Sequence, residues 1–157
     1  MNLLLYDSPI GRLGLMGEGD MLTTLSLPYQ PVPLIAPQET LVLREAKRQL
    51  EAYFAGRLRE FDLPLHLDGT PFRLKVWEQL RQIPYGQVIS YGELARRVGQ
   101  PGASRAVGGA NRHNPIPIIV PCHRVIAAGG TLGGYSGNCE GSAQIKRALL
   151  KLEGIHL

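Results

Sequence analysis

The chain has 157 residues and a mass of 17.2 kDa, enough for one ordinary domain or for two small ones. Hydrophobic residues make up 44% and charged residues 19%, a composition that excludes a disordered protein. No apolar run approaches the roughly 20 residues of a membrane span, and Asp7 interrupts an N-terminus that lacks the basic leader of a signal peptide. The net charge of +4 permits a polyanionic partner without requiring one.

The chain has two cysteines, Cys122 and Cys139, too few for a disulfide framework or a four-cysteine zinc site. The spacing of these two residues and His123 matches no helical or loop motif for a metal, so we expect no metal ion. Geometry alone allows a disulfide between the two cysteines. We expect a cytoplasmic, reducing location, however, and this disfavours the disulfide.

The first part of the chain, residues 1–67, is predicted to hold short strands and a helix. Alternating apolar residues indicate three strands, the last two joined by a Gly-rich hairpin turn, at 3–6, 12–16 and 22–27. A proline-rich connector follows at 28–37. Apolar residues at helical spacing predict a helix over 41–54, and renewed alternation predicts a further strand over 61–67.

The second part, residues 68–157, is predicted to be mostly helical. Thr70 and Pro71 form an N-cap and a first-turn proline, and Ser90 begins a capping box with Glu93. The helices are expected from 71 to before Pro84, then over 91–98, 103–111 and about 142–152. Two short helices joined by a Gly-containing turn at 100–102 are typical of a helix-turn-helix. The fold class is therefore α+β.

Glycines in the middle of the helix at 103–111 need an explanation. Gly108 and Gly109 each cost about 1 kcal/mol relative to alanine. Either another helix packs closely against them, or an external partner approaches this face, and the sequence leaves both open. Arg105, the one long side chain near the start of this helix, is a candidate contact for a phosphate or a groove.

Cys122 is the candidate nucleophile. It follows an apolar run at 118–120 and Pro121, a setting in which a cysteine is usually an inert core thiol. His123 and Arg124 follow it, and we expect them to create an electropositive setting that favours the thiolate. Because adjacent residues rarely point the same way, we expect His123 to reach the sulfur through a bridging water.

These residues identify a resemblance to a known family. The sequence at 121–125, Pro-Cys-His-Arg-Val, matches in full the active-site signature of the O6-alkylguanine-DNA alkyltransferases, also called methylated-DNA–protein-cysteine methyltransferases. The similarity extends over 70–135 and resumes in the last helix, with further matches at 84–86, 90–91, 104–110, 114–115 and 153–154. The resemblance implies a ribonuclease-H-like domain over 1–67 and, over 68–157, a DNA-binding and alkyl-acceptor domain with a winged helix-turn-helix.

The resemblance also implies roles for catalytic residues. Cys122 is similar to the alkyl acceptor, and His123 and Glu153 to the relay that draws its proton through a water. Asn114 resembles the asparagine that braces the turn between the DNA-binding helix and the cysteine. Tyr91 resembles the residue that rotates the phosphate of the target nucleotide and helps to protonate the departing base.

Binding residues follow from the same resemblance. The guanine pocket would be lined by the Val125 carbonyl, Tyr135, Ser136 and Asn111, the last at a position where relatives can carry an apolar residue. DNA would be contacted by Ser90, Arg105, Ala106, Gly108, Gly109 and Arg112, with Arg105 filling the gap left by the flipped guanine. The sequence departs from the family pattern at 137–142, where the loop is expanded.

The implied function is DNA repair by a methyltransferase that acts once. The protein would bind double-stranded DNA through the minor groove as a monomer, flip O6-alkylguanine out and transfer the alkyl group to Cys122, without a cofactor or a membrane. Base extrusion is needed because the damaged atom is buried in the duplex. The thioether product offers no carbonyl for water to attack, so the protein is not regenerated. The sequence leaves repair of O4-alkylthymine and cooperative binding along DNA open.

Three alternatives belong to other classes. A non-catalytic sensor of alkylated guanine would lack the cysteine, so the presence of Cys122 weighs against it. A cysteine hydrolase that uses Cys122 and His123 would turn over many times and would give the helix-turn-helix no purpose. Fusion to a metal-dependent transcription module is excluded by the length of the chain and its cysteine count.

Overall fold

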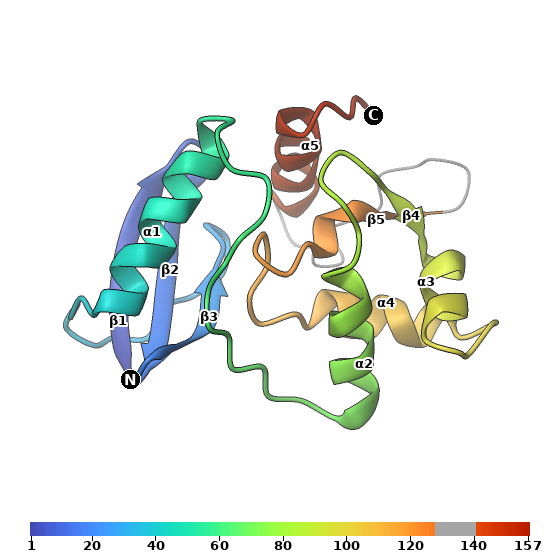
Figure 1. The fold of residues 1–157 in the computed structure, drawn as a ribbon, viewed down its shortest axis with the longest axis horizontal. Coiled ribbons are helices and arrows are strands. Elements are labelled where there is room, and N and C mark those ends of the chain that lie inside the picture. The colour runs from blue at the N-terminus through green and yellow to red at the C-terminus, as the bar shows by residue number, and fades with distance from the viewer. Residues whose placement is uncertain (128–140) are drawn as a thin grey trace. The chain divides into compact units, whose positions relative to one another are not determined.

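The computed structural model describes residues 1–127 and 141–157, and the chain forms two compact units, Met1–Leu67 and Asp68–Leu157. The first unit holds a three-stranded antiparallel sheet and a helix, and the second is mostly helical (Figure 1). The α+β class expected from the sequence is therefore confirmed.

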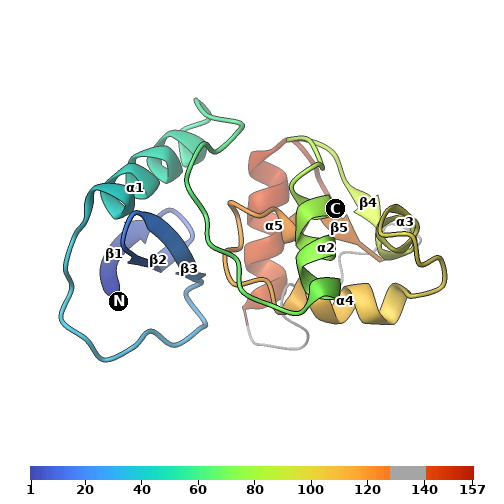
Figure 2. The same cartoon turned by 60° about the horizontal axis from the view of Figure 1, so that its bottom comes forward.

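The sheet of the first unit is a meander in the order β1 (Asn2–Ser8), β2 (Gly11–Glu18) and β3 (Met21–Ser26). Helix α1 (Leu41–Phe54) packs on this sheet, as Figure 2 shows. The proline-rich connector packs closely on β2, because a Cβ added to Gly14 would come within 2.6 Å of Val32. Leu13 and Leu15 of β2 are fully buried. The central strand thus carries much of the core of this unit.

Helix α1 covers the residues that the sequence predicts. The hydroxyl of Thr40 caps it by accepting a hydrogen bond from the amide of Leu43. The buried face includes Leu43 and Leu50, at helical spacing, and Tyr53. Tyr53, which the sequence analysis passed over, is fully buried, whereas the neighbouring Phe54 keeps partial exposure. The helix therefore buries a slightly different stripe from the one expected.

The strand predicted over 61–67 is wrong. Only an isolated bridge to Leu22 forms, in which the Leu22 amide donates to the carbonyl of Pro64 at 2.9 Å. Pro64 has no N–H group to extend a ladder. The Gln49 side chain holds the start of the segment instead, donating to the Asp62 carbonyl and accepting from the Asp62 amide, both at 2.9 Å. Side-chain hydrogen bonds thus replace strand pairing here.

The second unit packs short helices around a small parallel pair of strands. Its elements are α2 (Pro71–Leu80), β4 (Ile89–Ser90), α3 (Tyr91–Arg97), α4 (Ser104–Arg112), the 3-10 turn η1 (Cys122–Arg124), β5 (Val125–Ile126) and α5 (Ser142–Leu152). Helix α4 packs against α2 and α3, and α5 packs against η1. The buried Trp77 of α2 donates its indole N–H to the carbonyl of Ala110 at 2.8 Å and so fixes α4 in place.

Polar caps begin two of these helices where the sequence indicates. The Thr70 hydroxyl accepts from the amide of Arg73 at 3.2 Å, and the Ser90 hydroxyl accepts from the amide of Glu93 at 3.0 Å. The carboxylate of Glu93 pairs with Arg96 rather than reaching back to Ser90, so the expected capping box is only half formed. Helix α4 begins and ends one residue later than predicted.

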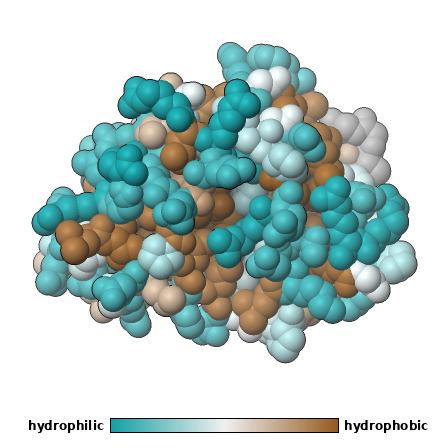
Figure 3. Space-filling model, in the orientation of Figure 1, coloured by the Kyte–Doolittle hydropathy of each residue, from teal (hydrophilic) through white to brown (hydrophobic). Residues whose placement is uncertain are grey.

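Hydrophilic side chains predominate on the face of the molecule shown in Figure 3, with apolar side chains between them. The longest described helix, α1, has 14 residues. Across the part of the chain that the structure describes, no helix is long and apolar enough to span a bilayer.

Candidate active site

Cys122 lies at the start of η1, after a turn with unusual backbone geometry. Cys122 is 2% exposed, and the apolar residues before it are buried as well. Ile118 has a φ of 73°, a left-handed conformation that a β-branched residue adopts only when its surroundings impose it. The structure therefore stores strain in the segment that delivers the cysteine.

Asn114 holds this strained turn together. Its Nδ2 donates to the carbonyl of Val120 at 2.8 Å, and its Oδ1 accepts from the amide of Ile116 at 3.0 Å. The neighbouring Asn111, at the end of α4, donates through Nδ2 to the carbonyl of Cys122 at 3.2 Å. Two buried asparagines thus connect the end of α4 to the backbone of the cysteine turn.

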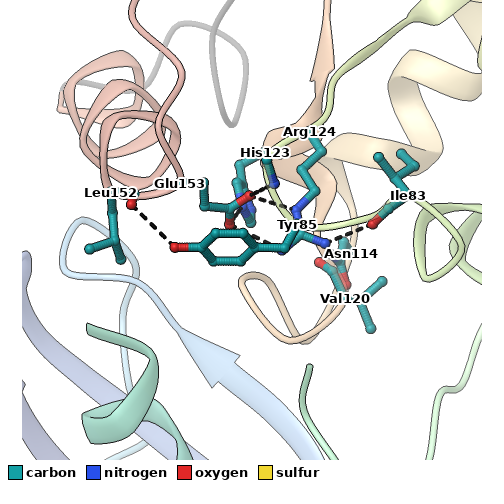
Figure 4. A network of polar contacts seen from close by, with 9 residues as sticks. Ile83, Tyr85, Asn114, Val120, His123, Arg124, Leu152 and Glu153 are labelled. Atoms are coloured by element: carbon teal, nitrogen blue, oxygen red, sulfur yellow. Dashed lines mark hydrogen bonds and ion pairs between the residues drawn. The ribbon is translucent and has the colours of Figure 1, made fainter. Parts of the chain in front are cut away.

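A buried network of polar groups surrounds Glu153 (Figure 4). Its Oε2 lies 2.7 Å from Nε2 of His123, and Arg124 donates to both carboxylate oxygens, at 2.8 and 3.1 Å. Arg124 also donates to the Ile83 carbonyl at 2.7 Å, and the Gly86 amide donates to Glu153 at 3.3 Å. The side chains of His123 and Glu153 are fully buried. The carboxylate is therefore surrounded by donors, which keeps it ionised.

The network determines which nitrogen of His123 carries the proton. Burial lowers the pKa of His123 below its usual range; Glu153 opposes this shift, whereas the charges of Arg124 and Lys146 add to it. The ring is therefore neutral near pH 7. Because the ionised Glu153 only accepts hydrogen bonds, Nε2 must be the protonated nitrogen, and Nδ1 carries the lone pair. A neutral ring in this tautomer is able to take up a proton.

The expectation that His123 and Arg124 make the setting of Cys122 electropositive needs correction. His123 is neutral near pH 7 because burial lowers its pKa, and the charge of Arg124 is paired with Glu153. Neither residue therefore supplies a net positive charge to the sulfur.

Tyr91 is the first residue of α3 and interacts electrostatically with Cys122. Burial raises its pKa, and the charge of the Cys122 thiolate raises it further, while Asn111 and Arg112 act in the opposite direction. The phenol is therefore protonated at neutral pH. Tyr91 and Cys122 are close enough to interact electrostatically, as their predicted roles require.

The residues predicted to bind DNA lie along α4 and at the start of α3. Arg105, Ala106 and Arg112 are exposed, whereas Ser90, Gly108 and Gly109 are partly exposed. A Cβ added at Gly109 would meet no described atom within 4 Å, and one at Gly108 would only touch the ring of Tyr91 at 3.8 Å. Close packing within the described chain therefore does not explain these glycines.

Two predicted pocket residues, Tyr135 and Ser136, lie outside the described residues, as do Cys139 and most of the expanded loop at 137–142. Val125 is described, and its carbonyl accepts a hydrogen bond from Lys146. Two residues at the site were not expected from the sequence, namely the anchoring Trp77 and the buried Lys146. Lys146 falls on the apolar face of its helix, and a charged residue at such a position is the sequence signal that could have pointed to it. Within residues 1–127 and 141–157, no cluster of three metal-ligating side chains occurs.

The chain thus combines a sheet-and-helix unit with a helical unit in which a buried cysteine precedes the histidine of a buried histidine–carboxylate pair. The family model of the 6-O-methylguanine DNA methyltransferase, DNA binding domain, matches residues 71–155. The family model of the 6-O-methylguanine DNA methyltransferase, ribonuclease-like domain, matches residues 3–67. The chain belongs to the 6-O-methylguanine DNA methyltransferase family.

Similar proteins share nearly the whole chain. A methylated-DNA–protein-cysteine methyltransferase of Mycobacterium bovis is 53% identical over 150 residues, which cover 94% of this chain and 88% of that protein. The constitutive enzyme of that name from Bacillus subtilis is 45% identical over 156 residues, which cover 95% of this chain and 93% of that protein. A crystal structure of Mycobacterium tuberculosis OGT in complex with DNA has a TM-score of 0.89 and 52% identity, covering 98% of this chain and 92% of that one. The resemblance inferred from the signature is thus confirmed over both units.

Proposed function

We propose that this protein repairs DNA by transferring the alkyl group of O6-alkylguanine to its own Cys122, irreversibly and once per molecule. The observation that carries the proposal is the buried His123–Glu153 pair, 2.7 Å apart, beside the buried Cys122. Relatives that are 45–53% identical are named methylated-DNA–protein-cysteine methyltransferases, which supports the same activity. No cofactor is needed, since the thiolate and the alkylated base are the only reactants.

In the proposed step, Nδ1 of His123 takes the proton of the Cys122 thiol through a bridging water, and Glu153 stabilises the imidazolium that forms. The sulfur attacks the alkyl carbon in line, so that a C–S bond forms while the C–O bond breaks and its electron pair stays on the guanine. Tyr91, protonated at neutral pH, gives a proton to the departing base. Asn114 keeps the cysteine turn in position throughout.

The proposed DNA-binding surface consists of α3, α4 and the turn between them, arranged as a helix-turn-helix. A helix with glycines and alanine on its outer face fits a narrow minor groove, and Arg105 is long enough to fill the position of the extruded guanine. Further contacts are assigned to Ser90, Ala106, Gly108, Gly109 and Arg112. The space left open beside Gly109 supports this assignment.

The guanine pocket is assigned to the Val125 carbonyl and Asn111, together with Tyr135 and Ser136, which lie outside the described residues. The ribonuclease-H-like domain is proposed to span 1–67, and the DNA-binding and acceptor domain 68–157. The protein acts as a monomer in the cytoplasm, where its thiol stays reduced. A sensor of alkylated guanine without transfer activity is the alternative, and it gives the His123–Glu153 pair no purpose.

Mass spectrometry of the intact protein tests the proposal. After incubation with a duplex that contains O6-methylguanine, we expect the mass to rise by one methyl group per molecule, carried by the peptide with Cys122. Cys139→Ser should still accept the methyl group and Cys122→Ser should not, while both should bind the duplex. A duplex with unmodified guanine is the control. A methyl group on Cys139, or many repaired bases per protein molecule, would overturn the assignment.

A further inference from the structure

Lys146 of α5 is a buried charged residue that the proposed mechanism does not use. Lys146 is 0% exposed, and its Nζ donates to the carbonyl of Val125 at 2.6 Å. Within the described chain, no carboxylate lies close enough to form an ion pair with it. Lysines are almost never fully buried without a charged partner, since desolvation disfavours the ammonium group. A fully buried lysine whose described hydrogen bond goes to a neutral carbonyl therefore needs a reason.

The groups around Lys146 belong to the active site. Its Nζ lies 5.9 Å from the centroid of the Tyr91 ring, within cation–π range. Burial lowers the pKa of Lys146 to about 8, and the Cys122 thiolate acts against this shift. Burial also lowers the pKa of His123, and the Lys146 charge adds to that effect. Lys146 thus faces Tyr91 from α3 and both Cys122 and His123 from η1.

The charge balance of η1 and the end of α5 indicates what Lys146 supplies. Glu153 is paired with Arg124, so these two charges cancel, and His123 is neutral before it takes the proton. None of the three offers a net positive charge to a thiolate at Cys122. Lys146, by contrast, is a cation that interacts electrostatically with Cys122.

We propose that Lys146 is a positioning residue for alkyl transfer: its ammonium group holds the Val125 carbonyl in place and stabilises the Cys122 thiolate by its charge. This role rests on the proposed function. The same charge lowers the pKa of His123, so Lys146 acts through the thiolate and not by making His123 a stronger base. The expected order of events is therefore a preformed cation, then a thiolate, then attack on the alkyl carbon.

The thiol titration of Cys122 tests this role without DNA. In a Cys139→Ser background Cys122 is the sole thiol of the chain, and the NMR shift of its Cβ reports the pKa. Lys146→Gln keeps a donor but removes the charge, and should raise the pKa of Cys122 by about one unit or more. Lys146→Arg and the control Lys151→Gln, an exposed position on the same helix, should stay near the unsubstituted protein. An unchanged titration in Lys146→Gln, or an equal shift in Lys146→Arg, overturns the proposal.

A reciprocal measurement needs no change at Lys146. If the two charges interact, Cys122→Ser must lower the pKa of Lys146, and the NMR titration of its ammonium group shows this shift. If Lys146 has the same pKa in the unsubstituted protein and in Cys122→Ser, the proposal is overturned. This measurement remains decisive even when Lys146→Gln fails to fold. The failure of the proposed function would appear only in the methyl-transfer assay with DNA. The two inferences therefore fail in different experiments.

Discussion

The two units differ in what they bury. Among the described residues, the buried polar side chains of the first unit are Ser26 and Gln49, both neutral. The second unit buries seven: Asn111, Asn114, His123, Arg124, Ser142, Lys146 and Glu153, of which His123, Arg124, Lys146 and Glu153 are ionisable. An interior with so many polar groups is costly unless each one is matched. The buried charged side chains of the described residues thus lie in the second unit, where the proposed chemistry takes place.

The way in which each unit matches its buried polar groups also differs. In the first unit, Gln49 bonds to the backbone of Asp62, a neutral interaction that holds a loop. In the second, Glu153 joins Arg124 and His123 in one charged cluster. A neutral pair can be replaced at modest cost, whereas a cluster of charges fails when one member is lost.

The largest expected difference between the two units comes from removing one charge of the buried cluster. Glu153→Gln leaves Arg124 buried without its carboxylate, so we expect the free energy of unfolding to fall by about 3–5 kcal/mol. Without the negative charge that stabilises the imidazolium of His123, alkyl transfer should slow by about 100-fold or more. Gln49→Leu, the matched change in the first unit, should cost only about 1–3 kcal/mol and leave transfer unaltered. Urea unfolding and single-turnover rates measure both effects, and equal stability losses would contradict the difference between the units.

A surface change should separate the DNA-binding role of the second unit from its chemistry. Arg105→Ala should slow repair in duplex DNA by about tenfold or more, because one groove contact is worth roughly 1–3 kcal/mol. Transfer from free O6-benzylguanine, which needs no base flipping, should change little. The salt dependence of DNA binding should weaken modestly. Arg57→Ala, at an exposed arginine of the first unit, is the control. Equal losses on both substrates would make Arg105 structural.

Acid should weaken the second unit through His123. Burial holds the pKa of His123 below its usual value, whereas the unfolded chain binds a proton near pH 6.5. The stability that the neutral ring contributes is present above about pH 6.5, and it is lost by about 1.4 kcal/mol per pH unit as the pH falls below that value. Amide hydrogen exchange between pH 7 and 5 should show this loss in the second unit, and His123→Gln should reduce it. A loss of the same size in His123→Gln would assign the effect to another group.

The smallest expected effect is one that the two units share. Thr40 caps α1 in the first unit and Thr70 caps α2 in the second, each through its hydroxyl. Replacement of either by alanine should lower the free energy of unfolding by about 1 kcal/mol. Similar losses for Thr40→Ala and Thr70→Ala would show that ordinary helix capping acts alike in both units. A much larger loss for one of them would point to a further role of that threonine.

Local patterns in the sequence were sufficient for much of the fold. The spacing of apolar residues predicted α1 over the observed residues, and the caps at Thr70 and Ser90 begin the helices that they were expected to begin. The apolar run before Cys122 correctly indicated a buried cysteine. Each of these features depends on residues within a few positions of one another, so each is readable from the chain.

The tertiary structure decided the features that depend on distant residues. A strand was predicted over 61–67, but Pro64 and the Gln49 side chain prevent it. Arg124 was expected to supply charge to the sulfur, yet a partner 29 residues away neutralises it. The role of Lys146 was not readable from the sequence, because the carbonyl that it holds lies 21 residues earlier in the chain. The electrostatic effect of a charged group depends on the groups that pack around it, and only the folded chain brings those groups together.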